Sequence, residues 1–247
     1  MFFLNAAFFQ AVFAACMLPC SFANESPIVD GRQIAASSDI SQIHKEHVTE
    51  VLLDLIPAET WVDHGIHCTP DLNEFRIIDI ASGNFIPHPA SQSAVLFSFC
   101  LPGHNFGENG IAIIAENKVI GLVVYSGGWD HRISALPDIN RDGRMEIRIS
   151  GGGMNQGEIW STSAIIGFSD GGVTSYGRIA DFSDDCENPY GRSGKEAAAI
   201  FVDAGPEPVF WRQTFRQPCD LQEGWLMMEK RQRFTLEADD VDYRRIK

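Results

Sequence analysis

The chain has 247 residues, which is enough for one sizeable domain or two small ones. Its 33 Asp and Glu residues outnumber its 19 Lys and Arg residues and give a formal net charge of −14. Because nucleic acids and anionic lipids are bound through basic patches, this balance argues against a nucleic-acid partner and suits a protein that binds cations.

Residues 1–23 form an apolar leader without a charged side chain. Ser21 and Ala23 place small residues at the −3 and −1 positions of a signal-peptidase site before Asn24. This pattern predicts a signal peptide over 1–23 and a periplasmic or secreted protein. Two alternatives stay open here: an uncleaved anchor, since the run is long enough to span a bilayer, and a lipid anchor through Cys16. After removal of the signal we expect no membrane span.

Four cysteines lie outside the leader, at positions 68, 100, 186 and 219. An even number of cysteines in an exported chain predicts two disulfides, and these four allow three pairings. We favour Cys68–Cys100 and Cys186–Cys219, because each pair flanks a contiguous β segment. No C-x-x-C spacing indicates zinc or redox chemistry.

The sequence predicts little β-structure in the N-terminal part of the processed chain. Residues 24–41 are polar and irregular, and we expect a flexible arm. The segment 44–56 is predicted to be a helix, because its apolar residues recur at spacings of three and four and share one face. Pro57 ends this segment.

Beyond residue 57 the apolar spacing changes to two, which is typical of strands. The predicted strands are 75–80, 93–101, 111–115, 119–125, 145–150, 163–168, 173–179, 209–215 and 225–236, and 197–202 is ambiguous between strand and helix. Segments 116–118 and 169–172 have the residues of short hairpin turns. The sequence therefore predicts a mainly β fold, an antiparallel meander that is propeller-blade-like or a sandwich, with one N-terminal helix. It also predicts a single β-rich domain over 42–247.

One segment, 138–146, has the pattern of a calcium-binding loop. Oxygen-bearing side chains occupy its positions 1, 3, 5 and 9, and Gly143 at position 6 permits a sharp turn. Calcium prefers about six to eight oxygen ligands, and loops of this kind supply a backbone carbonyl at position 7. The predicted ligands are Asp138, Asn140, Asp142, the carbonyl of Arg144, and Glu146. Clustering three acids is costly without a cation, which favours calcium as the cofactor.

The loop is not an EF-hand, because position 12 is Ile149 and the following residues alternate like a strand. Its strand–loop–strand setting resembles the calcium loop of FG-GAP or VCBS-type repeats, found in β-propellers such as integrin α-subunits. The resemblance covers residues 111–168, and the wider pattern is similar to exported bacterial proteins that carry such repeats. Phe106-Gly107 is not followed by Gly-Ala-Pro, and the loop occurs once. The resemblance therefore implies calcium binding without a tandem array of blades.

Two other segments are interpreted as structural. The glycine-rich stretch 151–157 lacks the Lys and the following helix of a phosphate loop, so we predict a bend that lets backbones approach. The acids at 181, 184, 185 and 187 surround Cys186 and are interpreted as a solvated turn that could lend a ligand to a second, weaker cation site.

Two functions are compatible with these features. The first is a non-catalytic exported domain, stabilised by calcium and disulfides, that binds a protein or carbohydrate ligand on its β surface. The alternative is a secreted or periplasmic hydrolase with a site near Asp130, His131 and Glu158, the polar groups nearest the loop in sequence. We favour the first, because no Gly-x-Ser-x-Gly elbow and no assignable pair of catalytic carboxylates occur in the sequence. Convergence of the three residues would favour the hydrolase.

Overall fold

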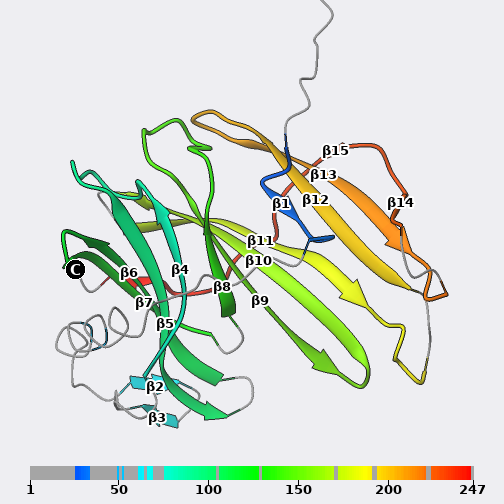
Figure 1. Ribbon diagram of the computed structural model, residues 1–247, viewed down its shortest axis with the longest axis horizontal. Coiled ribbons are helices and arrows are strands. Elements are labelled where there is room, and N and C mark those ends of the chain that lie inside the picture. The colour runs from blue at the N-terminus through cyan, green and yellow to red at the C-terminus, as the bar shows by residue number, and fades with distance from the viewer. Residues whose placement is uncertain are drawn as a thin grey trace, which may run out of the picture.

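The computed structural model describes residues 26–33, 49, 52, 61–63, 66–68, 75–103, 106–127, 130–169, 172–190, 194–220 and 224–245. These residues form two large antiparallel sheets and one small hairpin (Figure 1). The prediction of a mainly β, antiparallel fold is confirmed. The signal peptide predicted over 1–23 lies outside the described residues, as does the helix predicted over 44–56 except for Thr49 and Leu52.

The first large sheet, named here the β4–β7 sheet, has the strand order β16-β7-β6-β5-β4. Its strands are β4 (Arg76–Gly83), β5 (Gln92–Gly103), β6 (Phe106–Ala115), β7 (Lys118–Ser126) and β16 (Arg244–Arg245). Consecutive residues such as Val95, Leu96 and Phe97 are all buried, because side chains cover both faces of this sheet. One face packs on the second sheet, and the other carries a cluster that includes Leu52 and Phe75.

The second sheet, named the β8–β13 sheet, is a meander in which each strand pairs with the next along the chain. Its consecutive strands are β8 (Asp130–Ala135), β9 (Ile147–Asn155), β10 (Glu158–Ser169), β11 (Gly172–Asp184), β12 (Lys195–Asp203), β13 (Val209–Gln217) and β14 (Leu226–Met227). Two short strands join it off this path: β1 (Val29–Asp30) pairs with β12, and β15 (Gln232–Phe234) pairs with β13. The separate hairpin consists of β2 (Trp61–Asp63) and β3 (Ile66–Cys68).

Tight turns set the register of the hairpins. Glu116 and Asn117 have φ of 49° and 60°, and they join the paired residues Ala115 and Lys118. Two positive φ values in succession match the right-handed twist of the strands, so the predicted turn is confirmed here. At the predicted turn 169–172, Ser169 pairs with Gly172, so β10 and β11 form a hairpin, and the two residues between them lie outside the described part of the chain.

The two sheets enclose the main core and form a sandwich. Alternate residues of β8 and β9 point toward the β4–β7 sheet and pack there with the inner residues of β5, β6 and β7. The central members of this cluster are Ile133, Ile147, Ile149, Leu96, Ile111 and Val123. Of the alternatives predicted from sequence, the described strands form a meander and a sandwich, and they contain no propeller.

Several segments differ from the sequence prediction. Within the predicted arm, residues 26–33 include β1, which pairs with β12 and buries Val29 at 1% exposure. The predicted strand 225–236 is two short strands, β14 and β15. The glycine-rich stretch 151–157 is not a bend but the end of β9 and the following turn. The predicted close approach of backbones is confirmed, since a Cβ added to Gly152 would lie 2.2 Å from the Trp160 carbonyl oxygen of the neighbouring strand. The ambiguous segment 197–202 lies in strand β12.

The C-terminal strap, residues 237–245, connects the two sheets. In Figure 1 this red segment runs from the β8–β13 sheet across to the β4–β7 sheet, where β16 pairs with β7. Glu237 exchanges backbone hydrogen bonds with Arg178 of β11, and the Tyr243 ring packs 5.1 Å from the Tyr125 ring. The charged composition of residues 237–242 favours solvent exposure, but the strap is part of the structure between the sheets.

Candidate metal centre

The predicted calcium loop, residues 138–146, connects β8 to β9 and is held at both ends. The backbone N–H of Leu136 donates to the Glu146 carbonyl at 2.8 Å and closes the loop. Ile139 is fully buried in a cluster with Ile165 and Ile179, which anchors the loop to the β8–β13 sheet. On the other side, the N–H of Met145 donates to the Asn84 carbonyl at 2.7 Å, so the loop also contacts the β4–β7 sheet.

The loop backbone has positive φ at two positions. Arg141 and Gly143 have φ of 62° and 85°. Glycine adopts the second conformation without strain, as the sequence predicted for this position. No atom lies within 4 Å of a Cβ placed on Gly143, so the backbone angle and not crowding accounts for the glycine.

Backbone N–H groups orient the acidic side chains. Asp138 accepts from the N–H of Asp142 at 3.1 Å and from that of Gly143 at 2.8 Å. Asp142 in turn accepts from the N–H of Arg144 at 2.9 Å. A carboxylate has about four lone-pair directions, so each group keeps acceptor capacity for a cation.

Glu146 forms the buried side of the site. Its side chain is 1% exposed, and it accepts from the N–H of Ile139 at 2.8 Å and from the Tyr176 hydroxyl at 3.2 Å. Burial raises the pKa of Glu146, and the charges of Asp138 and Asp142 add to this effect while the two hydrogen bonds oppose it. A bound cation would reverse the balance, because it stabilises the charged carboxylate.

Three of the predicted ligands therefore converge. Carboxylate oxygens of Asp138, Asp142 and Glu146 lie within 4.8 Å of one another, so this acidic triad could hold a metal ion. Asn140 lies beside it: its Oδ1 accepts from the N–H of Asp142, and its Nδ2 donates to Tyr176 at 2.7 Å. The carbonyl of Arg144 stays a predicted ligand, while its guanidinium donates to the Phe168 carbonyl at 3.0 Å.

Tyr176 is a site residue that the sequence did not indicate. It comes from β11, 30 residues beyond Glu146, and its hydroxyl links Asn140 to Glu146. Burial and the neighbouring Glu146 charge raise the pKa of Tyr176. A tyrosine in an alternating strand has no local feature that distinguishes this role from ordinary packing.

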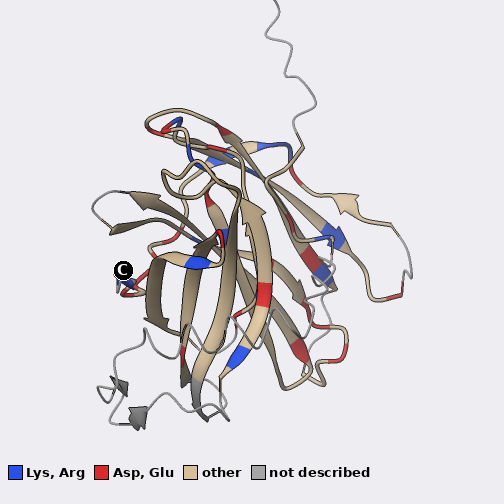
Figure 2. Cartoon of the chain, turned by 60° about the vertical axis from the view of Figure 1, so that its left-hand side comes forward, with Lys and Arg blue, Asp and Glu red and all other residues tan. Residues whose placement is uncertain are grey.

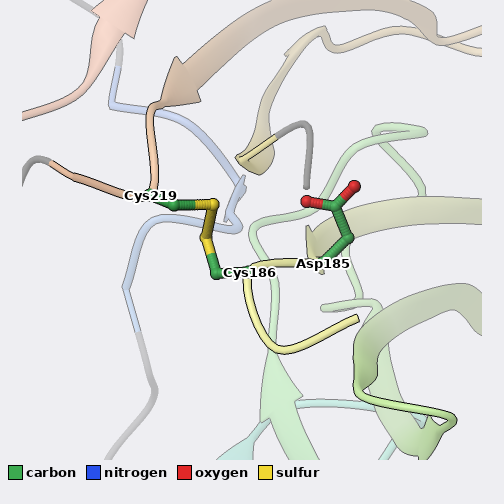
Figure 3. Close-up of side chains that lie close together, drawn as sticks. All are labelled: Asp185, Cys186 and Cys219. Atoms are coloured by element: carbon green, nitrogen blue, oxygen red, sulfur yellow. A yellow bond between two sulfur atoms is a disulfide. The ribbon is translucent and has the colours of Figure 1, made fainter. Parts of the chain in front are cut away.

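The acids around Cys186 do not form a second triad of carboxylates among the described residues. Asp185 lies near Cys186 and Cys219, but these cysteines form a disulfide, and disulfide sulfurs are not the thiolates that bind metals (Figure 3). Asp181 does not lie in a solvated turn as predicted. It is 1% exposed in β11, where it pairs with Arg148 at 2.9 Å. The predicted Cys186–Cys219 bridge is confirmed, whereas the side chains of Cys68 and Cys100 are outside the described part of the chain.

The three residues of the hydrolase alternative do not converge. Asp130 is opposite Gly151 in the β8–β9 pairing, whereas Glu158 is opposite Asn155 at the far end of the β9–β10 hairpin. Gly151 and Asn155 are four residues apart on β9, so at about 3.4 Å per residue the positions of Asp130 and Glu158 along the strand differ by about 14 Å. Asp130 accepts from the buried Tyr125 hydroxyl at 2.8 Å, whereas the His131 side chain is exposed.

No protein-family model, curated protein or solved structure matches this chain. Across the described ranges, no helix is long and apolar enough to cross a membrane. Acidic and basic positions are distributed over both sheets and not gathered on one (Figure 2).

The buried carboxyl of Asp130 predicts a pH effect on stability. Burial raises its pKa above the ordinary value of 3.8, although the Tyr125 hydrogen bond and the Arg178 charge oppose the shift. A group with a raised folded-state pKa contributes stability that is complete below its unfolded pKa and is lost as pH rises through the folded pKa. The free energy of unfolding of the wild type minus that of Asp130→Asn should therefore fall as pH rises above 3.8.

Urea unfolding of both proteins between acidic and neutral pH measures this difference. Asp220→Asn is the matched control for the loss of one negative charge, because Asp220 is exposed in a turn. A pH dependence no larger for Asp130→Asn than for Asp220→Asn would show that burial does not perturb Asp130.

Proposed function

We propose that the chain is an exported, non-catalytic β domain that binds calcium in the 138–146 loop and presents a binding surface for a further ligand. The observation that carries the proposal is the convergence of the Asp138, Asp142 and Glu146 carboxylates within 4.8 Å. Three like charges at this separation repel one another, and Glu146 is also buried. A divalent cation compensates both costs.

The donor set favours calcium among the common metals. The residues around the triad offer carboxylate, amide and carbonyl oxygens, and the described part of the loop holds no His or Cys. Such oxygens suit calcium, magnesium or manganese and disfavour zinc and copper. Irregular oxygen geometry with an Asn and a backbone carbonyl suits calcium, because magnesium demands octahedral geometry at short distances and gives up its waters reluctantly. The FG-GAP or VCBS-type resemblance of the loop agrees with this choice.

Two further observations support the remaining parts of the proposal. The Cys186–Cys219 disulfide is compatible with an oxidising compartment, as expected after export through the predicted signal. The separation of Asp130 from Glu158 supports a non-catalytic role over the hydrolase alternative.

Calcium should raise the stability of the native chain. At a free ion level of about 100 times the dissociation constant, the free energy of unfolding should increase by about 2.7 kcal/mol. Asp142→Ala should remove most of this gain, because it deletes both a charge and an oxygen ligand. Asp142→Asn keeps one oxygen and should be intermediate. Magnesium should substitute poorly.

The measurement is a set of melting curves in calcium, magnesium and chelator for the wild type and these variants. Asp220→Asn, which removes an exposed acid outside the loop, controls for a general effect of net charge. Calcium should stabilise this control as much as the wild type. Superimposable wild-type curves in calcium and chelator would contradict the proposal and leave the loop as a polar turn.

A further inference from the structure

A polar groove of about 290 Å³ lies where the edge strands of the two sheets meet. Strand β4 forms one wall, and β8 with the adjacent β9 forms the other. The sheets are joined here through a side chain, because the N–H of Ile133 donates to the Asp79 carboxylate at 3.1 Å. The polar side chains that line the groove belong to Asp79, Ser82, Arg132, Ser134, Arg148 and Ser150.

The strand register explains why polar groups gather on this wall. Arg132 is opposite Ser150, and Ser134 is opposite Arg148. Opposite residues of an antiparallel pair share a face, and so do residues two apart on one strand. These four side chains therefore lie on one face of β8 and β9, whereas the intervening Ile133 belongs to the sandwich core.

Two of the charged groups in the groove already have partners. Arg148 pairs with the buried Asp181 at 2.9 Å and donates through Nε to Ser163 at 2.7 Å. Asp79 is 4% exposed and accepts the backbone N–H groups of Ile80 and Ile133. Most hydrogen-bonding groups of Arg148 and Asp79 are therefore already used within the protein, where they stabilise the strands that line the groove.

Arg132 differs from both. Its Nη1 is buried and has no hydrogen-bond partner among the described residues. A buried donor left without a partner costs about 1–3 kcal/mol, and native proteins leave few of them. An arginine fork lining a groove is suited to a planar oxyanion, since guanidinium and carboxylate form two parallel hydrogen bonds.

We propose that this groove binds the carboxylate of a small polyhydroxylated ligand, a sugar acid, with Arg132 as the carboxylate-binding residue. The size of the groove is near the lower end of small-molecule sites, about 300 Å³. Serine hydroxyls at 82, 134 and 150 can donate to and accept from ligand hydroxyls. The unpartnered Nη1 of Arg132 matches a single carboxylate, whereas the Asp79 charge in the same groove would repel a dianion such as phosphate more strongly than a monoanion.

This inference deepens the proposed binding role by naming a ligand class, and it does not depend on the cation site. Calorimetric titration with glucuronate should show saturable binding, and glucose, the uncharged match, should bind at least about tenfold more weakly, or 1.4 kcal/mol. A galacturonate trimer distinguishes the source of the sugar acid: tighter binding than galacturonate indicates an acidic polysaccharide, and equal binding indicates a free monosaccharide. Inorganic phosphate should compete poorly.

The variant Arg132→Gln should weaken glucuronate binding about tenfold, the loss of one charge-assisted pair. Arg132→Lys keeps the charge but not the planar guanidinium, so its affinity for glucuronate should lie between those of the wild type and Arg132→Gln. Arg76→Gln is the matched control, because Arg76 is exposed at the start of β4 outside the groove, and it should bind within about twofold of the wild type. Melting curves establish that each variant is folded.

The outcomes separate this proposal from the previous one. Asp142→Ala should remove most of the calcium effect and leave glucuronate binding unchanged. Arg132→Gln should weaken glucuronate binding about tenfold and leave the calcium effect unchanged. Equal binding of glucuronate and glucose, or no saturable binding of glucuronate to the wild type, would overturn the sugar-acid proposal. So would unchanged affinity in a folded Arg132→Gln variant.

Discussion

Replacing Asp239 by alanine should lower the free energy of unfolding by about 3 kcal/mol, because it breaks a buried ion pair. The Asp239 side chain is fully buried, and it accepts from Arg178 at 2.6 Å, Ser175 at 3.0 Å and Tyr243 at 2.9 Å. Alanine leaves all three donors without this acceptor. The expected loss is near the lower end for buried pairs, because the Arg178 side chain is 32% exposed and water can solvate it.

The effect should extend along the C-terminal strap. Tyr243 packs on Tyr125, and Arg244 pairs with the buried Glu108 at 2.7 Å, so both contacts depend on where Asp239 fixes the segment. Amide exchange in β16 should accelerate more in Asp239→Ala than exchange in β10, where the ladder is independent of the strap. Asp239→Asn keeps an acceptor oxygen and should be intermediate.

Urea denaturation measures the change in stability, and Asp240→Ala is the matched control. Asp240 is the next residue along the chain but is exposed, so its removal should change stability by less than about 0.5 kcal/mol. Equal losses for the two variants would indicate a general effect of removing negative charge near the terminus. A negligible loss for Asp239→Ala would mean that the strap does not hold the sheets together.

The strap also illustrates what the sequence could not predict. Residues 237–242 are mostly charged, and local composition favours solvent exposure for such a run. The partners of the strap are distant in sequence: Asp239 pairs with Arg178 on β11, and Arg244 pairs with Glu108 on β6. Burial of a charge depends on a partner brought close by the fold, and a single sequence has no signal for that pairing. The same reason explains Asp181, predicted as solvated but buried against Arg148.

The pattern of apolar residues predicted strands correctly where one or both faces of the strand are covered by apolar neighbours. The continuous apolar runs of β5, β6 and β7 predicted strands correctly because this sheet is buried on both sides. Strand β8 was missed, because its face toward the groove carries Arg132 and Ser134, and only Ile133 and Ala135 pack in the core. The short strand β1 was missed because two residues are too few to show alternation.

At the candidate metal centre, the sequence predicted the loop residues but not their supports. The spacing of Asp138, Asp142 and Glu146 is local, so it could be recognised without the fold. Tyr176 reaches the loop from β11 and Asn84 from the residue after β4, so neither could be identified in this way. Which metal the triad holds depends on coordination geometry, and the melting experiment with calcium and magnesium addresses that question directly.

Opening the Cys186–Cys219 bridge should lower the free energy of unfolding by about 3–4 kcal/mol, the chain-entropy value for a closed loop of this length. The two cysteines are 33 residues apart, and their Cα atoms lie 5.5 Å from each other. The loop between them contains β12 and β13, so the bridge joins the end of β11 to the end of β13 (Figure 3). In the unfolded chain the same bridge removes conformational freedom, which is the main source of its stabilising effect.

The test compares Cys186→Ser, Cys219→Ser and the double variant by urea denaturation. Each single change opens the same bridge, so the losses should be equal and the double variant should lose no more than either single one. Thiol labelling of the denatured, unreduced wild type should find neither cysteine free. Losses that add in the double variant would show that the cysteines stabilise the fold separately through packing. Equal losses well below about 2 kcal/mol would instead indicate that β12 and β13 keep their structure in the unfolded chain and leave the bridge little freedom to remove.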